Sequence, residues 1–241
     1  MTERAGERLS IVMPVFNEVV IIEEVLEEVL REIAAKHSVF EIVVVDDASN
    51  DGTSEILDAI AAREDGVIVH HADVNRGHGA TLRRAIEATT GEWIFHVDSD
   101  GQFVLNEFWR LWDERHEADL ILGVRANRRD PFHRRVLSVA VRWVASLLAM
   151  RSLRDPNVPF KLFRQALWND LRPFVGEEVL APSILLSVGA SLRNWRVCEV
   201  PVSHLPRQHG RSSLRPGRLL TLSLRGFVQL IRFRYRARRI R

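Results

Sequence analysis

Two carboxylates stand one residue apart in the stretch FHVDSDGQF, residues 95–103. Asp98 and Asp100 end a largely apolar run, and the amide of Gln102 follows them. Gly101 makes a bend easy here, so both carboxylates can turn toward one point. Hard oxygen ligands of this kind suit Mg²⁺ or Mn²⁺, which commonly bind through one or two carboxylates and the phosphates of a substrate. The alternative is a solvated acidic turn that caps the next helix.

Polar segments also follow three other predicted strands. In chain order they contain Asn17 and Glu18, then Asp46 and Asp47, then residues 75–79. The carboxyl ends of parallel strands meet at one edge of a sheet, and ligands bind in the crevice outside that edge. Four polar strand ends therefore favour a binding site over an isolated acidic turn.

The elements that must position these residues alternate along the first half of the chain. Nearly continuous Val- and Ile-rich runs predict strands at 9–15, 41–47, 66–71, 92–98 and 118–124. Amphipathic runs between them predict helices at 18–36, 53–64, 80–90 and 105–117. This order predicts an α/β fold with a mainly parallel central sheet and helices on both faces.

The second half is less regular. It predicts a helix at about 131–150, a loop and short strand within 154–164, a helix at 177–188, a strand at 194–202 and a polar loop from 203 to 217. No linker marks a second globular domain. We expect a catalytic domain over residues 1–217 and a basic amphipathic helix over 218–241.

Two short segments carry turn chemistry at predicted helix starts. In ASNDGT (48–53), Asp51 or Thr53 can cap the following helix. In NRGHGA (75–80), Gly77 and Gly79 allow a tight turn and a close approach of the backbone. That second turn would either hold a phosphate or simply redirect the chain.

Charge is distributed unevenly over the 241 residues. The net charge is +2, but eleven arginines and no acidic residue follow Glu199, so the preceding part holds 23 basic against 32 acidic residues. An acidic body with a basic tail suggests a polyanionic partner for the tail. The single cysteine, Cys198, excludes an internal disulfide and suits a reducing compartment.

The tail predicts a helix with two separate stripes. One is polar and mostly basic, with Arg218, Thr221, Arg225, Gln229, Arg232 and Arg236; the other is apolar, with Leu220, Leu224, Phe227, Val228, Ile231 and Tyr235. This pattern indicates a helix lying on an anionic membrane surface. The alternative is a helix that packs on its own domain or on a partner subunit. Nucleic acid fits less well, because the apolar content is too high for an arm that tracks phosphates.

No run reaches the roughly 18 apolar residues that a spanning helix needs. The best run, 136–150, carries Arg142 in its middle, and the N-terminal MTERAGERLS does not resemble a secretory signal. We therefore expect a cytoplasmic protein that is peripherally associated with the cytoplasmic face of a membrane, directly or through a membrane-anchoring protein.

Four motifs in order resemble family 2 glycosyltransferases of the GT-A fold. They are PVFNE (14–18), VVVDDASNDGT (43–53), NRGHGA (75–80) and VDSDGQ (97–102). Two later motifs, DP followed by PFKLFR (155–164) and RQHGRSS (207–213), are similar to those of the dolichol-phosphate and polyprenyl-phosphate sugar synthase branch. The likeness covers about residues 9–215. The Q-x-x-R-W motif of processive polysaccharide synthases is missing, which disfavours a polymer-forming enzyme.

The resemblance implies a donor site with assigned roles. Pro14, Val15, Asn17 and Glu18 would line the nucleotide, Asp46 would lie beside the base and ribose, and Asp98 and Ser99 would complete the donor contacts. Asp98, Asp100 and Gln102 match the D-x-D-x-Q pattern that bridges Mg²⁺ or Mn²⁺ to the donor diphosphate.

The same resemblance implies a catalytic set of Asp100, Arg125 and Arg207, the arginines lying where the branch places them on phosphates. His78 and Ser213 depart from the branch, which usually has lysine at both positions. Phosphate contacts from these two positions are therefore not carried over.

The implied reaction is a metal-dependent, inverting transfer of a hexose from GDP-mannose or UDP-glucose to a polyprenyl or dolichyl phosphate. A lipid phosphate, with a second pKa near ~6, is already ionised at neutral pH and can attack directly. A sugar hydroxyl would instead need a carboxylate base, for which Glu177 and Glu178 are the candidates. A third hypothesis is a non-catalytic nucleotide-sugar-binding scaffold on membranes.

Overall fold

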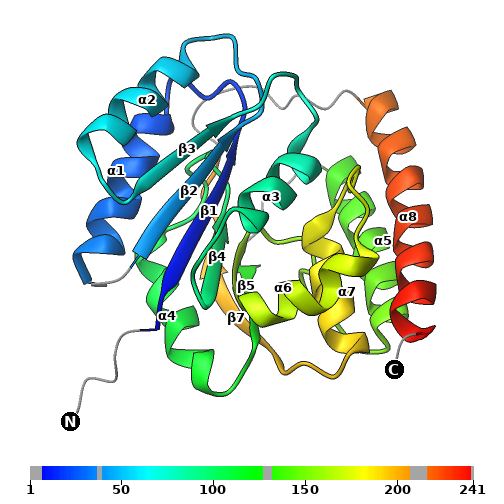
Figure 1. The fold of residues 1–241 in the computed structure, drawn as a ribbon. Coiled ribbons are helices and arrows are strands. Elements are labelled where there is room, and N and C mark those ends of the chain that lie inside the picture. Colours follow the sequence, from blue (N-terminus) through cyan, green and yellow to red (C-terminus); the bar gives the residue numbers. More distant parts are fainter. Residues whose placement is uncertain (1–6, 37–39, 127–131, 207–215, 240–241) are drawn as a thin grey trace.

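The computed structural model describes residues 7–36, 40–126, 132–206 and 216–239, whose strands form one sheet of seven in the order β3-β2-β1-β4-β6-β5-β7 (Figure 1). The strands are β1 (Leu9–Val15), β2 (Phe40–Asp46), β3 (Val67–His71), β4 (Trp93–Val97), β5 (Leu120–Ala126), β6 (Phe160–Arg164) and β7 (Val197–Ser203). Only β6 runs antiparallel to its neighbours within this part of the chain. The predicted mainly parallel sheet is confirmed.

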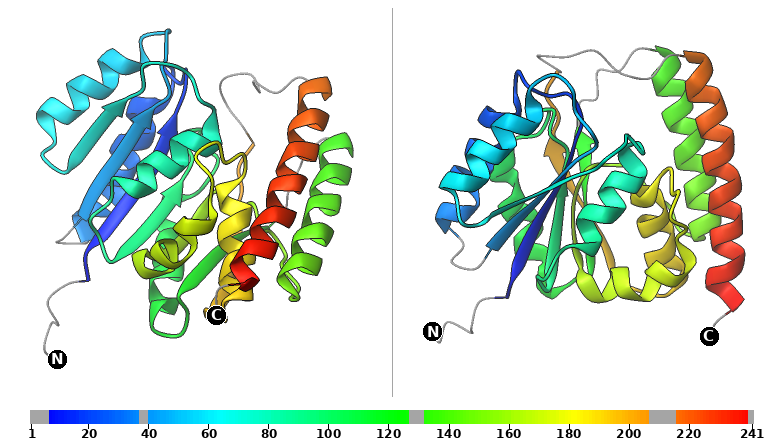
Figure 2. Two further views of the ribbon diagram at one scale, coloured as in Figure 1. Left: turned by 45° about the vertical axis from the view of Figure 1, so that its right-hand side comes forward. Right: turned by 45° about the horizontal axis from the view of Figure 1, so that its top comes forward.

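Helices cover both faces of the sheet (Figures 1 and 2). They are α1 (Ile22–Glu32), α2 (Thr53–Arg63), α3 (His78–Glu87), α4 (Phe108–Asp113), α5 (Phe132–Ala149), α6 (Gln165–Leu171), α7 (Pro182–Leu192) and α8 (Pro216–Arg239). Helices α1, α2 and α4 lie on one face, and α3, α6 and α7 lie on the other. Helices α5 and α8 lie side by side in an outer layer against α7.

The middle of the sheet is apolar because it is covered on both faces. Every residue of β1 and β4 is buried. The ring of Phe95 on β4 meets Phe108 of α4 and Phe160 of β6 edge-on, each with ring centroids 4.8 Å apart. These contacts fix the end of β4 in place, and with it the position of the two carboxylates that follow.

Two predicted helices differ from the structure in their extent. The helix expected at 177–188 begins only at Pro182, because proline lacks an amide hydrogen and favours the first helical turn. Residues 177 and 178 form a turn before it. The helix expected at 105–117 is broken into α4 between 3₁₀ turns at Leu105–Glu107 and Glu114–His116. The sequence reading also missed α6.

The start of α3 packs tightly against the turn that precedes α7. A Cβ atom added at Gly79 would lie 2.1 Å from the carbonyl oxygen of Val179 and 2.8 Å from that of Leu180. The close approach expected of this glycine is therefore a contact between two backbone segments. It joins the loop after β3 to the loop before α7 at the carboxyl edge of the sheet.

Gly79→Ala should lower the free energy of unfolding by about 1–3 kcal/mol, the usual cost of overpacking, because backbone must move to admit the methyl group. Gly176→Ala is the matched control, since a Cβ there meets nothing within 4 Å. It should change stability by no more than about 0.5 kcal/mol. Chemical denaturation of both variants measures this, and equal effects would contradict the packing described.

Candidate active site

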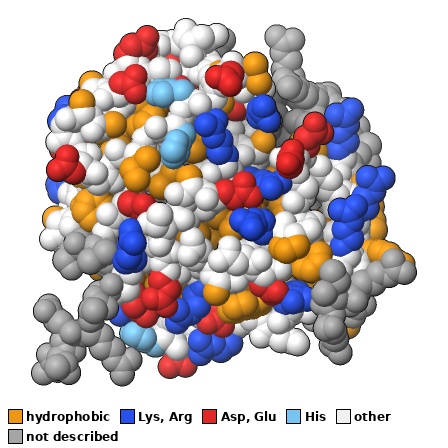
Figure 3. All heavy atoms as spheres, viewed as in Figure 1, with side chains coloured by type: hydrophobic (Ala, Val, Ile, Leu, Met, Phe, Trp, Pro, Cys, Tyr) orange, Lys and Arg blue, Asp and Glu red, His pale blue; other side chains and the backbone are white. Residues whose placement is uncertain are grey.

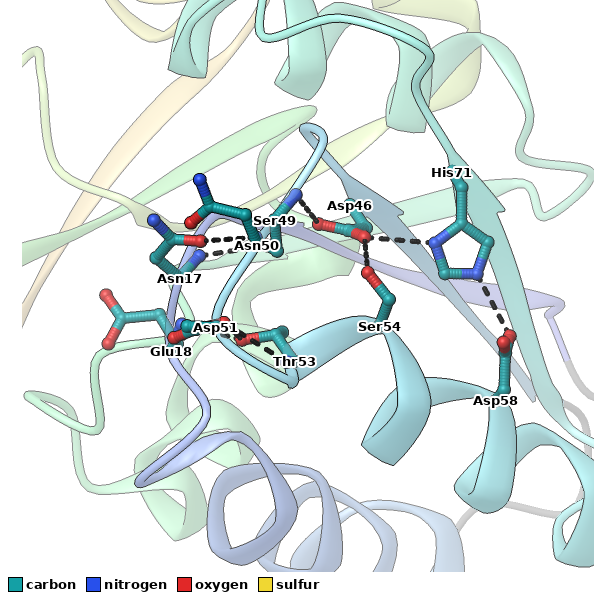
Figure 4. A network of polar contacts seen from close by, with 10 residues as sticks. All are labelled: Asn17, Glu18, Asp46, Ser49, Asn50, Asp51, Thr53, Ser54, Asp58 and His71. Atoms are coloured by element: carbon teal, nitrogen blue, oxygen red, sulfur yellow. Dashed lines mark hydrogen bonds and ion pairs between the residues drawn. The ribbon is translucent and has the colours of Figure 1, made fainter.

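The loops after β1 and β2 are fastened to each other by side chains (Figure 4). The amide of Asn17 donates to Ser49 Oγ at 2.9 Å, and the amide of Asn50 donates to Asn17 Oδ1 at 2.9 Å. Asn17 has φ of +54°, a left-handed conformation that asparagine tolerates better than most residues. The amide of Glu18 donates to Thr53 Oγ1 at 3.0 Å. The two loops therefore form one rigid wall.

The carboxylate of Asp46 supports this wall from below. It is buried and accepts hydrogen bonds from Ser49 N at 3.1 Å and Ser54 Oγ at 2.6 Å. His71 Nδ1 lies 3.0 Å from it, and His71 Nε2 lies 2.9 Å from Asp58 (Figure 4). Burial opposes ionisation of Asp46, but these hydrogen bonds outweigh it and lower its pKa. The same two carboxylates raise the pKa of His71.

The next carboxylate, Asp47, holds the glycine loop. Its two oxygens accept the amides of Arg76 and Gly77, each at 2.8 Å. These two donors are therefore engaged within the protein, and the loop turns the chain into α3. The prediction that Asp51 or Thr53 caps α2 is wrong, because Gly52 occupies the cap position with φ of +101° and without a side-chain cap hydrogen bond. Asp51 lies one residue earlier, and its Oδ1 accepts the amide of Thr53 at 3.1 Å.

Backbone contacts bring the ends of β1, β2 and β4 together. Ser99 Oγ donates to the carbonyl of Pro14 at 3.3 Å, and the amide of Asp47 donates to that of Val15 at 2.9 Å. Ser99 is buried. The predicted site residues Pro14, Val15 and Ser99 thus join strand ends, and their neighbours line the edge.

Asp98 sits at this edge beside two histidines. His96 Nε2 lies 3.3 Å from Asp98 Oδ1, and His78 Nε2, at the start of α3, lies 3.9 Å from the same oxygen. Asp98 Oδ1 and His96 Nε2 are both buried, and neither has a hydrogen-bond partner among the described residues. Burial lowers the pKa of His96 to about 4, so its imidazole is neutral at pH 7.

The neighbours of Asp98 favour its ionised form. Burial opposes its ionisation, but the nearby His78, His96 and Arg125 outweigh it and keep the pKa of this carboxyl below its usual value. The guanidinium of Arg125 pairs with both oxygens of Asp155, Nε at 2.6 Å and Nη2 at 2.9 Å. Arg125 thus reaches the site already oriented by an acidic partner.

Lys161 lies inside the sheet next to His96, its register partner across β4 and β6. It is fully buried, and its Nζ donates to the carbonyls of Ser183 at 3.1 Å and Pro156 at 3.4 Å. Burial lowers the pKa of Lys161 to about 7, although Asp155 and Asp98 act to raise it. In the sequence, this lysine lies within the PFKLFR motif.

The segment that leads into the last motif returns to the acidic loop. Gln102 Nε2 donates to the carbonyl of Leu205 at 3.0 Å, and the amide of Leu205 donates to that of Gln102 at 2.8 Å. The amide of Gln102 also donates to Asp100 Oδ1 at 3.2 Å. Arg207 and Ser213 lie outside the described residues.

The structure gathers most of the predicted site at one edge and adds three members. Asn17, Glu18, Asp46, Asp98, Asp100, Gln102 and Arg125 all follow or end strands there. His96, Asp155 and Lys161 were missed; a polar residue inside a buried strand was the available signal for the histidine and the lysine. Glu177 and Glu178 are exposed in the turn before α7.

Several known proteins are similar to this chain in sequence. The family model described as Glycosyl transferase family 2 matches residues 10–170. An undecaprenyl-phosphate 4-deoxy-4-formamido-L-arabinose transferase from Pseudomonas fluorescens is 31% identical over 222 residues, covering 89% of this chain and 62% of the relative. A dodecaprenyl-phosphate galacturonate synthase from Rhizobium johnstonii is 27% identical over 95% of this chain and 68% of its own length.

Solved structures share the fold. Glucosyl-3-phosphoglycerate synthase from Mycobacterium tuberculosis, bound to Mn²⁺ and UDP-glucose, aligns with a TM-score of 0.70 at 19% identity, over 95% of this chain and 79% of that one. The chain spans 34% of the length of another relative, glycosyltransferase AglD from Haloferax volcanii, and about three-fifths of the arabinose transferases. The chain has the GT-A fold and belongs to glycosyl transferase family 2.

Proposed function

We propose that this chain transfers a hexose from a nucleotide sugar, GDP-mannose or UDP-glucose, to a polyprenyl or dolichyl phosphate at a membrane surface. The observation that carries this proposal is the buried Oδ1 atom of Asp98, which lacks a hydrogen-bond partner among the described residues and lies among loops from four strand ends. A carboxylate oxygen in that setting fits a divalent cation better than it fits a capping turn. The family and the lipid-phosphate acceptors named in its relatives support the reaction class.

The donor nucleotide would lie against the wall made by the loops after β1 and β2. Asn17 and Glu18 present side chains there, and Asp46 fixes the shape of the wall from within. Asp98, Asp100 and Gln102 would hold Mg²⁺ or Mn²⁺ on the diphosphate side. When bound, the ion supplies Lewis-acid stabilisation of the negative charge that grows on the departing diphosphate.

In the proposed reaction, a phosphate oxygen of the acceptor attacks the anomeric carbon as the bond from that carbon to the diphosphate oxygen breaks. The electron pair leaves with the nucleoside diphosphate, and the configuration inverts. Arg125, oriented by Asp155, and Arg207 would supply fixed positive charge to the phosphates, which costs little reorganisation during the reaction. No general base is required, because the acceptor is already ionised.

The outer helices offer the surface that such an acceptor requires. Among the side chains described on α8, Leu230, Phe233 and Ala237 pack inward, while Phe227, Val228, Ile231 and Tyr235 are exposed. Three residues of α5, Val139, Trp143 and Leu147, form a second exposed apolar stripe together with Met150, which directly follows the helix. Leu147 and Leu148 of α5 accept hydrogen bonds from Arg234 of α8 at 3.0 and 2.7 Å. We define these eight exposed residues as the outer apolar face.

Exposed arginines lie beside the outer apolar face. Arg225, Arg232 and Arg236 are exposed on α8, and Figure 3 shows basic side chains over this helix at the right-hand side. An apolar surface flanked by cations matches an anionic lipid interface, and the relatives' names specify lipid-linked acceptors. Within the described ranges, helices long and apolar enough to cross a bilayer are absent.

A second candidate keeps the donor site and uses a sugar hydroxyl as acceptor. The turn that carries Glu177 and Glu178 continues into Val179 and Leu180, which contact the start of α3 beside His78. Either carboxylate would then serve as the base. A non-catalytic scaffold is the remaining alternative, and product analysis separates all three.

Asp100→Asn should reduce transfer of labelled sugar into the organic phase by at least about 10²-fold, because it removes charge from the diphosphate side. The assay combines a panel of nucleotide sugars, Mg²⁺ or Mn²⁺, and a short polyprenyl phosphate. Removal of the metal with EDTA should have the same effect. Asp113→Asn, at an exposed position at the end of α4, is the control and should stay active. Full activity of Asp100→Asn, or in EDTA, would refute the proposed mechanism.

We expect the wall formed by the loops after β1 and β2 to lose stability as pH rises, because His71 then loses its proton. Its raised pKa means that the ion pair with Asp46 stabilises the fold fully below the unfolded pKa of 6.5 and is lost above the folded value. The lowered pKa of Asp46 has the opposite pH dependence. It stabilises the fold above pH 3.8, and this contribution is lost only as the pH falls below that value. Because His71 is 39% exposed, its pair contributes at most about 1 kcal/mol, or roughly 2–4 °C.

His71→Asn should therefore lower the melting temperature at about pH 5.5 and lose this effect by about pH 8.5. Thermal unfolding at both pH values measures the difference. His70→Asn is the control, because neighbouring side chains of β3 point to opposite faces. A pH-independent effect of His71→Asn would show that the pair is not charged.

The triple variant Trp143→Ser, Leu147→Ser and Ile231→Ser should weaken binding to anionic vesicles at least about tenfold, since each side chain loses apolar burial in the interface. Co-sedimentation with phosphatidylglycerol vesicles measures this. Ile68→Ser with Val74→Ser, two exposed apolar residues outside α5 and α8, is the control. Unchanged vesicle binding would contradict membrane docking, and a changed molar mass in light scattering would instead assign the face to a second copy.

A further inference from the structure

The strongest cluster of metal-ligating side chains in the described part of the chain is not the one that the motif predicts. Its members are His78, His96 and Asp98, whose ligand atoms all lie within 4.8 Å of one another. Two of these three residues are nitrogen ligands, and neither belongs to the D-x-D-x-Q pattern. The cluster joins the start of α3 to the end of β4.

We infer that His78 Nε2, His96 Nε2 and Asp98 Oδ1 bind one divalent transition-metal ion of the borderline class, such as Mn²⁺, Co²⁺ or Zn²⁺. The inference deepens the proposed function, because the ion is the one assigned there to Asp98, Asp100 and Gln102. It rests on that function only in assigning the remaining coordination positions to Asp100, Gln102 and diphosphate oxygens. Binding of the ion itself is a property of the free protein.

The distances suit such a site. Metal bonds to histidine nitrogen and carboxylate oxygen of about 2.0–2.2 Å place neighbouring ligand atoms about 3 Å apart and opposite ones about 4 Å apart. The observed separations from Asp98 Oδ1 are 3.3 Å to His96 and 3.9 Å to His78. A small rotation of the exposed His78 side chain completes the geometry, because this residue is 54% exposed.

A bound ion would stabilise the buried ligand atoms of His96 and Asp98 more than that of the exposed His78. His96 is 1% exposed, and its Nε2 and Asp98 Oδ1 are without hydrogen-bond partners among the described residues. A buried polar atom that lacks a hydrogen-bond partner destabilises the folded protein. One cation between the two atoms would satisfy both.

The ligand set decides which ion is preferred. Oxygen ligands alone suit Mg²⁺, whereas imidazole favours transition metals, with affinity rising from Mn²⁺ through Co²⁺. Two imidazoles and a carboxylate also leave open positions, as catalytic zinc sites do. The replacement of the branch's usual lysine by His78 would therefore exchange a fixed positive charge for a metal ligand.

Isothermal titration of the chelator-treated full chain with Co²⁺, together with its visible d–d absorption, tests the inference without any turnover. Wild type should bind Co²⁺ far more tightly than Mg²⁺. His78→Lys and His96→Asn should each weaken Co²⁺ binding at least about tenfold, the loss caused even by outer-shell changes at metal sites. His116→Asn, an exposed histidine on another segment, should bind as wild type.

The exposed His78 keeps the test decisive even where His96→Asn unfolds. Co²⁺ binding by His78→Lys equal to that of wild type overturns the inference, as does loss of binding in Asp100→Asn alone. Metal binding that fails while sugar transfer persists refutes only the histidine site. Metal binding that follows the expected pattern with no transfer to any acceptor refutes only the proposed function.

Discussion

Two adjacent carboxylates at the end of β2 hold the carboxyl edge of this sheet together. Asp46 and Asp47 accept backbone amides from two different loops, one after β2 and one after β3. Neighbouring residues of an extended chain point to opposite sides, so the pair can serve both loops at once. A charged acceptor makes each of these hydrogen bonds stronger than a neutral one. The shape of the edge depends on the hydrogen bonds that both carboxylates accept.

Burial of charge is the second constraint on this region. Arg125, Asp155, Lys161 and Asp98 all lie in or next to the sheet, where an uncompensated charge is costly. The structure compensates by interleaving opposite signs and by using carbonyls of residues 156 and 183 for the lysine. Such an arrangement is stiff, which suits a site that must present fixed charge to phosphates.

The repeating part of the fold was predictable because its signals are local. Strands β1 to β5 fell within about two residues of their predicted bounds, since continuous apolar runs mark strands buried on both faces. The second half was harder. The position of β6 between β4 and β5, antiparallel to both, depends on pairing with residues far away in the chain. Helix α7 begins at Pro182, although the acidic residues before it favoured a start at residue 177.

The site residues were likewise predictable where their signals are local, and not where they depend on contacts between distant parts of the chain. Asp98, Asp100 and Gln102 were identifiable from their spacing, and Asn17 and Asp46 from their place after strands. The two histidines beside Asp98 were not, because His78 and His96 are 18 residues apart and meet only when α3 packs on β1 and β2. The tail helix was read as two stripes. The third, inward face, with Leu230 and Phe233, becomes visible only with the helix docked on α7 and Phe174.

Gln229 connects the docked helix α8 to the turn before α7. Its side chain bonds the amide of Leu180 at 3.0 Å and the carbonyl of Glu178 at 2.8 Å, the same turn that abuts Gly79. The turn at residues 178–180 thus contacts both the last helix and the start of α3. If α8 moves along α7, it must therefore either break both hydrogen bonds of Gln229 or move the turn that contacts Gly79. A displacement of the last helix would then reach the carboxyl edge of the sheet.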